Sequence, residues 1–168
     1  MVIQKRLKKQ FVALLHEHQG IVHQICRVYF VAPQDREDAF QEVVLQLWKS
    51  FPKFRQEAKV TTWMHRVALN TILKKIRQEQ ARPHLAQLEE AEPQTVANQA
   101  PEINDYMEYA LLQLPPVDKA LVILHLEGYN YEEIAQILAL TKTNVASKLN
   151  RIKQKIKQII TQEKYAAQ

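Results

Sequence analysis

The sequence predicts an all-α protein made of two small helical domains that are joined by a flexible acidic linker. Apolar residues recur every three or four positions through residues 5–78 and again through residues 105–162, which is the spacing of helices that bury one face. Only two glycines occur among 168 residues, whereas a β-rich fold with many tight turns needs more. Residues 79–104 lack the helical spacing and are interrupted by prolines.

Three helices are expected in the first domain. The first covers residues 5–31, and Pro33 ends it. Asp35 suits the N-cap of a second helix over residues 36–51, and a short basic loop then leads to a third helix over residues 62–78. The third helix is expected to bury Trp63, Val67, Ala68, Ile72 and Ile76.

The linker over residues 79–104 is rich in Ala, Gln and Glu, and its acidic residues outnumber its basic ones. Few large apolar side chains and several prolines favour a flexible chain there. A short helix within residues 85–92 is the alternative for that part of the linker. The second domain then begins with a helix over residues 105–114. Pro116 suits the first turn of the next helix, and Gly128 suits the cap at its end.

Residues 128–157 have the spacing of a helix-turn-helix. A short helix opens at Tyr131, a tight connection follows at residues 139–141, and a second helix buries Val145 and Leu149. Ala135 provides the small side chain that two steeply crossing helices need at their contact. The second helix of such a unit lies in the major groove of DNA. Its outward face is expected to carry the hydrogen-bonding side chains Lys142, Asn144, Ser147, Lys148, Asn150 and Arg151. An ordinary helical hairpin with a solvated polar face is the alternative.

Charge is segregated along a chain whose formal net charge is +5. Residues 49–77 hold eight basic residues against the single acid Glu57, and residues 142–164 hold seven against Glu163. A solvated face would explain either run alone. Together with the helix-turn-helix, two basic surfaces on tethered domains indicate two contacts with one polyanion, the second made effectively intramolecular by the tether.

The helix over residues 62–78 combines cations, amides and aromatic rings. Arg66, Asn70 and Lys74 recur at helical spacing, and Trp63 lies at the start of the helix. Such a surface suits unstacked bases, which stack on rings and hydrogen-bond through their edges. Core packing remains the favoured role for the Trp63 ring. The preceding helix shows an acidic face, which DNA would repel and a basic protein partner would attract.

No catalytic, cofactor or metal-binding pattern stands out in the sequence. The six histidines form no HExxH motif, and surface or semi-buried positions are expected for them. The single cysteine, Cys26, excludes an internal disulfide and favours the cytoplasm. No apolar run approaches the roughly 20 residues of a membrane span. Neither membrane insertion nor a small-molecule substrate is therefore expected.

Two segments carry a resemblance to the bacterial sigma-70 family of RNA polymerase initiation factors, in particular the extracytoplasmic-function (ECF) group. Residues 35–54 and 61–78 read DREDAFQEVVLQLWKSFPKF and TTWMHRVALNTILKKIRQ, which resemble region 2. Residues 111–158, which include the runs LPP and YEEIA, resemble region 4. The resemblance implies a non-enzymatic factor that binds core polymerase, reads the −35 element as duplex and opens the −10 element.

The resemblance also implies residue roles. Asp38, Gln41 and Glu42 would dock on the clamp helices of the β′ subunit. The −10 strand would meet Lys59, Thr62, Trp63, Arg66, Asn70 and Lys74, with Asn70 at the pocket for a flipped base. The −35 duplex would meet Ser147, Lys148 and Arg151. Further implied partners are the β flap and an anti-sigma factor, and the acidic linker would run toward the RNA exit path.

The recognition helix departs from the family pattern in ways that bear on its sequence preference. Ala146 and Lys148 stand where arginines are common, and Asn150 stands where an aromatic residue is common. Fewer guanidinium groups weaken bidentate reading of guanine, while Asn144 and Asn150 suit adenine. The sequence therefore predicts an A/T-leaning −35 element.

Two other classes of protein compete with this interpretation. A stand-alone helix-turn-helix regulator explains residues 128–157 but leaves the acidic face and the first basic surface without a purpose. A helical nucleic-acid enzyme would need paired carboxylates or metal ligands, and no such pattern is evident.

Overall fold

The computed structural model describes residues 2–55, 57–81 and 103–166. Every regular element in this part of the chain is a helix, as the sequence predicts. The elements are, in order, α1 Val2–Tyr29, α2 Pro33–Ser50, the short 3-10 helix η1 Phe51–Lys53, α3 Val60–Ala81, α4 Ile103–Leu112, α5 Pro116–Leu126, α6 Tyr131–Leu138 and α7 Lys142–Ala166.

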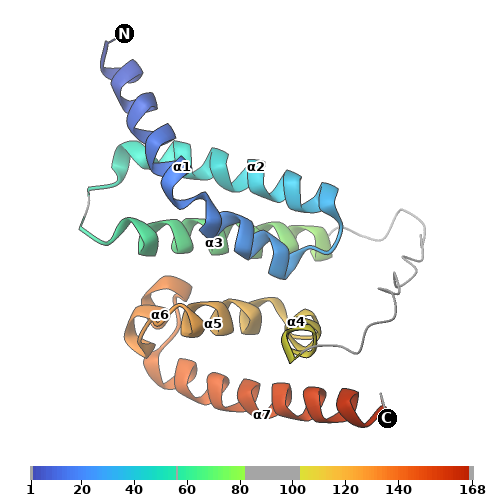
Figure 1. The fold of residues 1–168 in the computed structure, drawn as a ribbon. Coiled ribbons are helices and arrows are strands. Elements are labelled where there is room, and N and C mark those ends of the chain that lie inside the picture. The colour runs from blue at the N-terminus through green and yellow to red at the C-terminus, as the bar shows by residue number, and fades with distance from the viewer. Residues whose placement is uncertain (1, 56, 82–102, 167–168) are drawn as a thin grey trace.

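The helices form two domains that lie one above the other (Figure 1). Helices α1, α2 and α3 make the first domain, and α4 to α7 make the second. Helices α4, α5 and α6 face the first domain, whereas α7 runs along the outer side of the second. The first domain therefore covers the side of the second domain that lies opposite α7.

The core of the first domain follows the predicted helical spacing, with one shift in α3. Ala68 and Ile72 are buried as expected, but Trp63, Val67 and Ile76 are only half-buried. The other fully buried side chains of α3 are Met64, His65, Leu69 and Leu73. This helix contacts α1 and α2 on one side and α5 and α6 on another, so a wider arc of its surface is covered than one amphipathic face.

Two helix boundaries in the first domain differ from the sequence prediction. Helix α2 begins at Pro33 rather than after Asp35, because the extended Ala32 is its N-cap and Pro33 occupies the first helical position. Asp35 lies in the first turn and is not the N-cap. Helix α1 ends at Tyr29, two residues before the expected end at residue 31.

The predicted linker is helical at both of its ends. Helix α3 continues to Ala81, and α4 begins at Ile103, so the boundaries drawn at residues 79 and 104 lie inside helices. The short helix considered for residues 85–92 lies outside the described residues.

The proline and the glycine predicted to start and to end a helix of the second domain lie where expected. Pro116 occupies the first turn of α5. Gly128 follows the end of α5 with φ +85°, and its N–H donates to the His125 carbonyl at 3.1 Å. The Tyr129 N–H donates to the Leu124 carbonyl at 3.1 Å, which completes a Schellman motif. This turn sets the direction in which the chain enters the helix-turn-helix.

Candidate functional site

The helix-turn-helix is held by capping interactions at each helix start. The Asn130 side chain accepts from the Glu133 N–H at 2.9 Å, and the Glu133 carboxylate accepts from the Asn130 N–H at 2.8 Å. This reciprocal capping box fixes the start of α6. The Thr141 hydroxyl accepts from the Asn144 N–H at 3.1 Å and so caps α7. Between the two helices, Ala139 takes the left-handed conformation with φ 55°.

The packing of α6 against α7 agrees with the sequence in its central residues. Ile134 and Ala135 are buried on α6, and Val145 and Leu149 are buried on α7. Leu138, which was expected to be buried, is half-buried, and Ile137 is buried in addition.

Five of the six residues predicted on the DNA-facing side of α7 fall into two groups by exposure. Ser147, Asn150 and Arg151 are exposed on the side of α7 that faces away from Val145 and Leu149. Asn144 and Lys148 are half-buried, because at 100° per residue they lie at the edge of this face. The helix thus presents a central polar stripe with two flanking side chains.

Lys142 is exposed at the start of α7 and pairs with the first helix of the unit. Its Nζ donates to the Glu132 carboxylate at 2.7 Å. This hydrogen bond, together with the charge of Lys142, lowers the pKa of Glu132. The pair ties α6 to the start of α7, so Lys142 has a structural partner as well as its predicted role toward DNA.

Sequence reasoning missed two residues of the outward stripe. Thr143 and Gln154 are exposed, and they lie four residues before and seven residues after Ser147. Positions three, four or seven residues apart share one side of a helix, so these side chains extend the stripe of Ser147 and Asn150 in both directions. The helical period of the sequence places both residues on the outward side of the helix. The prediction instead favoured the basic residues beside them.

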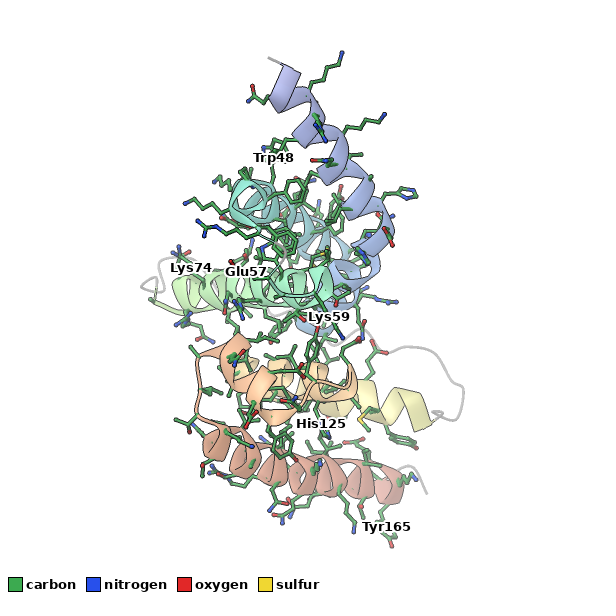
Figure 2. The ribbon with its side chains drawn as sticks, turned by 90° about the vertical axis from the view of Figure 1, so that its left-hand side faces the viewer. Trp48, Glu57, Lys59, Lys74, His125 and Tyr165 are labelled. Carbon is green, nitrogen blue, oxygen red and sulfur yellow. The ribbon has the colours of Figure 1, made fainter. Side chains whose placement is uncertain are left out.

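Helix α3 presents a second polar stripe. Arg66, Asn70 and Lys74 are all exposed and lie four residues apart. Lys59 directly precedes the helix, and its carbonyl accepts from the Trp63 N–H at 3.1 Å. Figure 2 shows Lys59 and Lys74 well apart from each other on the first domain. The stripe therefore offers cations and an amide along most of the length of α3.

Trp63 and Thr62 lie at the edge of this stripe and are half-buried. The Trp63 ring stacks on Phe54, with ring centroids 4.7 Å apart and planes inclined by 25°. Its position thus combines packing with partial exposure. A ring that is already stacked on one neighbour is rigid, which suits a platform for bases.

A cleft of about 430 Å³ lies between α2 and α3. It brings together residues that the sequence assigned to different partners, since Glu42 lines it from α2, and Asn70 and Lys74 line it from α3. The remaining lining residues are Gln46, Thr71, Lys75, Gln78 and Glu79. Amide, hydroxyl and ammonium groups around one hollow can bind the edge of an unstacked base.

The acidic face of α2 contains an exposed apolar residue that sequence reasoning missed. Asp38, Gln41 and Glu42 are exposed, as predicted. Leu45 is 47% exposed and lies three residues after Glu42 and seven after Asp38, so it shares their side of the helix. An apolar centre beside charged groups is the usual composition of a protein-binding surface.

In the described ranges, no helix is both long enough and apolar enough to cross a membrane.

Two family profiles match the chain. The profile for Sigma-70 region 2 matches residues 14–82, and that for Sigma-70, region 4 matches residues 104–156. Among characterised proteins, the chain is 26% identical over 151 residues to the ECF RNA polymerase sigma factor SigM of Mycobacterium tuberculosis, covering 89% of this chain and 76% of the relative. It is 27% identical over 172 positions to the ECF RNA polymerase sigma-E factor of Haemophilus influenzae, covering 92% and 89%.

Solved structures share the fold. The sigma factor RpoE of Bartonella quintana, crystallised with the anti-sigma factor NepR, superposes with a TM-score of 0.65 at 15% identity and covers 94% of this chain and 98% of that chain. CnrH, solved with the cytosolic domain of CnrY, gives a TM-score of 0.63 at 18% identity, covering 92% and 89%. Both matches extend over the two domains together.

Proposed function

The chain belongs to the sigma-70 family of bacterial initiation factors, in its ECF group, and from that premise we propose how its surfaces divide the work of promoter recognition. As an ECF sigma factor it binds core RNA polymerase and directs promoter-specific initiation. The main support for this assignment of surfaces is that each of the two family regions carries its own exposed polar stripe, one on α3 and one on α7.

In our proposal the acidic face of α2 docks on the clamp helices of the polymerase β′ subunit. Asp38 and Glu42 supply charges for a basic partner, Gln41 supplies hydrogen bonds, and Leu45 supplies the apolar contact at the centre. The second domain would bind the β flap.

The α3 stripe would hold the opened −10 strand. Arg66, Lys74 and Lys59 would neutralise phosphates, and the stacked Trp63 would support a base. Asn70 is our choice for reading a flipped base, because it lines the cleft between α2 and α3.

The outward stripe of α7 would read the −35 duplex in the major groove. Ser147 and Asn150 lie at its centre, Arg151 lies beside them, and Thr143 and Gln154 extend it. The Ser147 hydroxyl donates to the Thr143 carbonyl at 2.7 Å, which leaves its oxygen available to accept from a base.

Two further elements of the proposal rest on the family. An anti-sigma factor is the expected regulatory partner, since the structurally similar RpoE of Bartonella quintana was crystallised with the anti-sigma factor NepR. We place the protein in the cytoplasm, where core polymerase works. A stand-alone helix-turn-helix regulator is not favoured, because the region 2 match covers residues 14–82.

Charge reversal on α2 tests the docking surface. Replacing Asp38→Arg and Glu42→Arg should reduce the affinity for core polymerase by at least tenfold, because two attractive contacts with a basic surface become repulsive. The measurement is a titration of labelled protein with purified core enzyme. Glu17→Arg is the control, since Glu17 is an exposed acid on α1 and so lies outside the acidic face of α2. Equal losses in the control and the double variant would contradict the assignment.

A further inference from the structure

The first turns of α1 extend beyond the rest of the first domain. In Figure 1 this end of the helix projects past α2. The side chains of residues 4–10 are exposed, except for the half-buried Leu7. The profile for Sigma-70 region 2 begins at residue 14, so the family match does not account for this part of the helix. We call residues 4–10 the basic arm.

The basic arm carries four exposed cations, which are Lys5, Arg6, Lys8 and Lys9. The sequence contains no aspartate or glutamate before Glu17. The ion pairs that the described residues form all involve other side chains. Within the described part of the chain, the charge of the arm is therefore turned toward solvent and is not neutralised.

These charges are unfavourable for the helix that carries them. Lys8 and Lys9 lie three and four residues after Lys5, which is the spacing at which like charges on a helix repel each other. Lys5 also lies in the first turn of α1, where the helix dipole disfavours a cation. A polyanion beside the arm would relieve both effects. The charge pattern is thus better suited to an external polyanion than to the stability of α1.

The basic arm is held in a fixed direction by its continuity with the rest of α1. Phe11, directly after the arm, is 5% exposed. Its ring centroid lies 5.1 Å from that of Trp48 and 5.4 Å from that of Phe51. The helix continues without a break from this anchor through the arm. A partner therefore meets cations on a backbone that is already ordered, which lowers the entropic cost of binding.

The same aromatic cluster connects the base of the arm to the start of the α3 stripe. Phe51, which contacts Phe11, also lies 6.2 Å from the Trp63 ring, measured between centroids. Lys49 and Lys53 lie two residues to either side of Phe51 in the sequence, and both are exposed. Further cations thus surround the point where the arm leaves the domain. The arm therefore adjoins a surface that the proposed function already assigns to DNA.

We propose that the basic arm binds the phosphate backbone of DNA, as a third DNA-binding surface beside the stripes of α3 and α7. The step from a polyanion to DNA rests on the proposed function, which brings promoter DNA to the adjacent α3 stripe. Lysine and arginine side chains contact phosphates without reading sequence.

An acidic protein is the competing partner for the arm. A protein-binding surface has an apolar centre, and Leu7 is the one apolar residue in the sequence of the arm. Leu7 lies four residues before Phe11 and so points to the side of the helix that packs on the domain. The outward side of the arm consists of cations and glutamine, which favours phosphates over a protein surface.

Paired substitutions separate the position of the charge from its amount. Lys5→Gln with Lys9→Gln removes two charges from the arm, and glutamine has nearly the helix propensity of lysine. Arg27→Gln with Lys164→Gln is the matched control, since it removes the same charge from exposed positions near the ends of α1 and α7. Lys5→Arg with Lys9→Arg keeps the charge and should behave as the native protein. Far-UV circular dichroism confirms that each variant keeps its helices.

Salt dependence of DNA binding by the full chain measures the phosphate contacts. The probe is a labelled oligonucleotide, used as a single strand and as a duplex, and binding is followed by fluorescence anisotropy over a series of salt concentrations. Each phosphate contact contributes about 0.7 to the slope of log affinity against log salt for a single strand and about 0.9 for a duplex. Losing two contacts should flatten the slope by about 1.4 or about 1.8, and the probe whose slope falls is the form of DNA that the arm contacts. The control should keep the native slope.

Equal slopes in the arm variant and its control, with both probes, would overturn the proposal. Polyglutamate that binds the native protein but not the arm variant, while the DNA slopes stay equal, would assign the arm to an acidic protein and would also overturn it. Arg66→Gln with Lys74→Gln tests the proposed function separately. If this pair leaves the single-strand slope unchanged while the arm variant flattens it, the arm stands and the assignment of α3 fails.

Discussion

The polar residues of this protein fall into two groups, those whose side chains face water and those whose side chains face the other domain. The side chains assigned to DNA and to core polymerase are exposed or half-buried on α2, α3 and α7, or directly before α3. Lys119 and His65 are instead the two buried polar residues among the described side chains, and each contacts a residue of the other domain. The expectation of a surface or semi-buried position is therefore wrong for His65, which is 2% exposed. The contacts between the domains and the proposed binding surfaces thus use different residues.

His65 gives the stability of the protein a defined pH dependence. Burial lowers its pKa below the ordinary value of about 6.5, although the Thr61 carbonyl and the charge of Glu127 act in the opposite direction. The unfolded chain therefore binds more protons, so the contribution of His65 is fully present above pH 6.5 and is lost as the pH falls through that value. The free energy of unfolding in urea should be smaller at pH 5.5 than at pH 7.5.

His65→Asn should reduce this pH difference. His65 lines a cleft between the domains, and the other ionisable groups around this cleft are Glu17 and His18 of α1, and Glu127 and Tyr129 after α5. His18→Gln is the control, because His18 is the other histidine that lines the cleft. A pH difference that persists unchanged in His65→Asn would contradict the prediction.

The −35 preference is also decided by single side chains. With Asn150 exposed at the centre of the α7 stripe and Ala146 without a polar group, we expect an A/T-leaning −35 element. Selection of promoter variants by the polymerase holoenzyme, followed by sequencing, measures the preference. Asn150→Arg should shift the selected bases toward guanine, while Gln162→Arg, an exposed position near the end of α7, should not. A G-rich −35 consensus selected by the native protein would refute the prediction.

Helix ends are the elements that fix the geometry of the reading unit. Two residues with positive φ bracket α6, Gly128 before it and Ala139 after it. Glycine adopts this conformation without strain, whereas alanine there costs roughly 1–2 kcal/mol. The turn after α6 is therefore strained, and the turn before it is not.

Two opposite substitutions test this difference. Gly128→Ala should lower the free energy of unfolding by about 1 kcal/mol, because no other atom lies near the new Cβ and the cost is purely that of φ +85°. Ala139→Gly should raise it by up to about 1 kcal/mol. Gly20→Ala is a useful comparison, since Gly20 is exposed in the middle of α1 and alanine should stabilise that helix by about 1 kcal/mol. Urea unfolding compares the three, and destabilisation by Ala139→Gly would contradict the account of the turn.

The presence and order of the helices were predictable from the sequence, because they depend on the local spacing of apolar residues and on helix-start and helix-end residues such as Pro116 and Gly128. The start of α2 was not predictable, because Asp35 and Pro33 are both typical of helix starts and it is the proline that occupies the first helical position. The burial of His65 and Lys119 could not be foreseen. Their neighbours Tyr129 and Val28 lie 64 and 91 residues away, and no local pattern reports such contacts.

At the scale of the whole molecule, the protein consists of two domains that pack against each other (Figure 1). Each domain matches one sigma-70 region, and in our proposal the exposed stripes on α3 and α7 give each domain a surface for DNA. The tether between the domains makes the second DNA contact intramolecular once the first has formed. Two moderate contacts then act together, and each of them should weaken with rising salt.

Transcription in vitro tests the central claim most directly. Purified core RNA polymerase is mixed with fragmented genomic DNA of the source bacterium, with and without this protein, and the transcript 5′ ends are sequenced. The account predicts new start sites that share a −10 and a −35 element at constant spacing, and their loss with the Asp38→Arg, Glu42→Arg variant but not with Glu17→Arg. Start sites identical to those of core enzyme alone, or new sites that share only a −35 element, would contradict it.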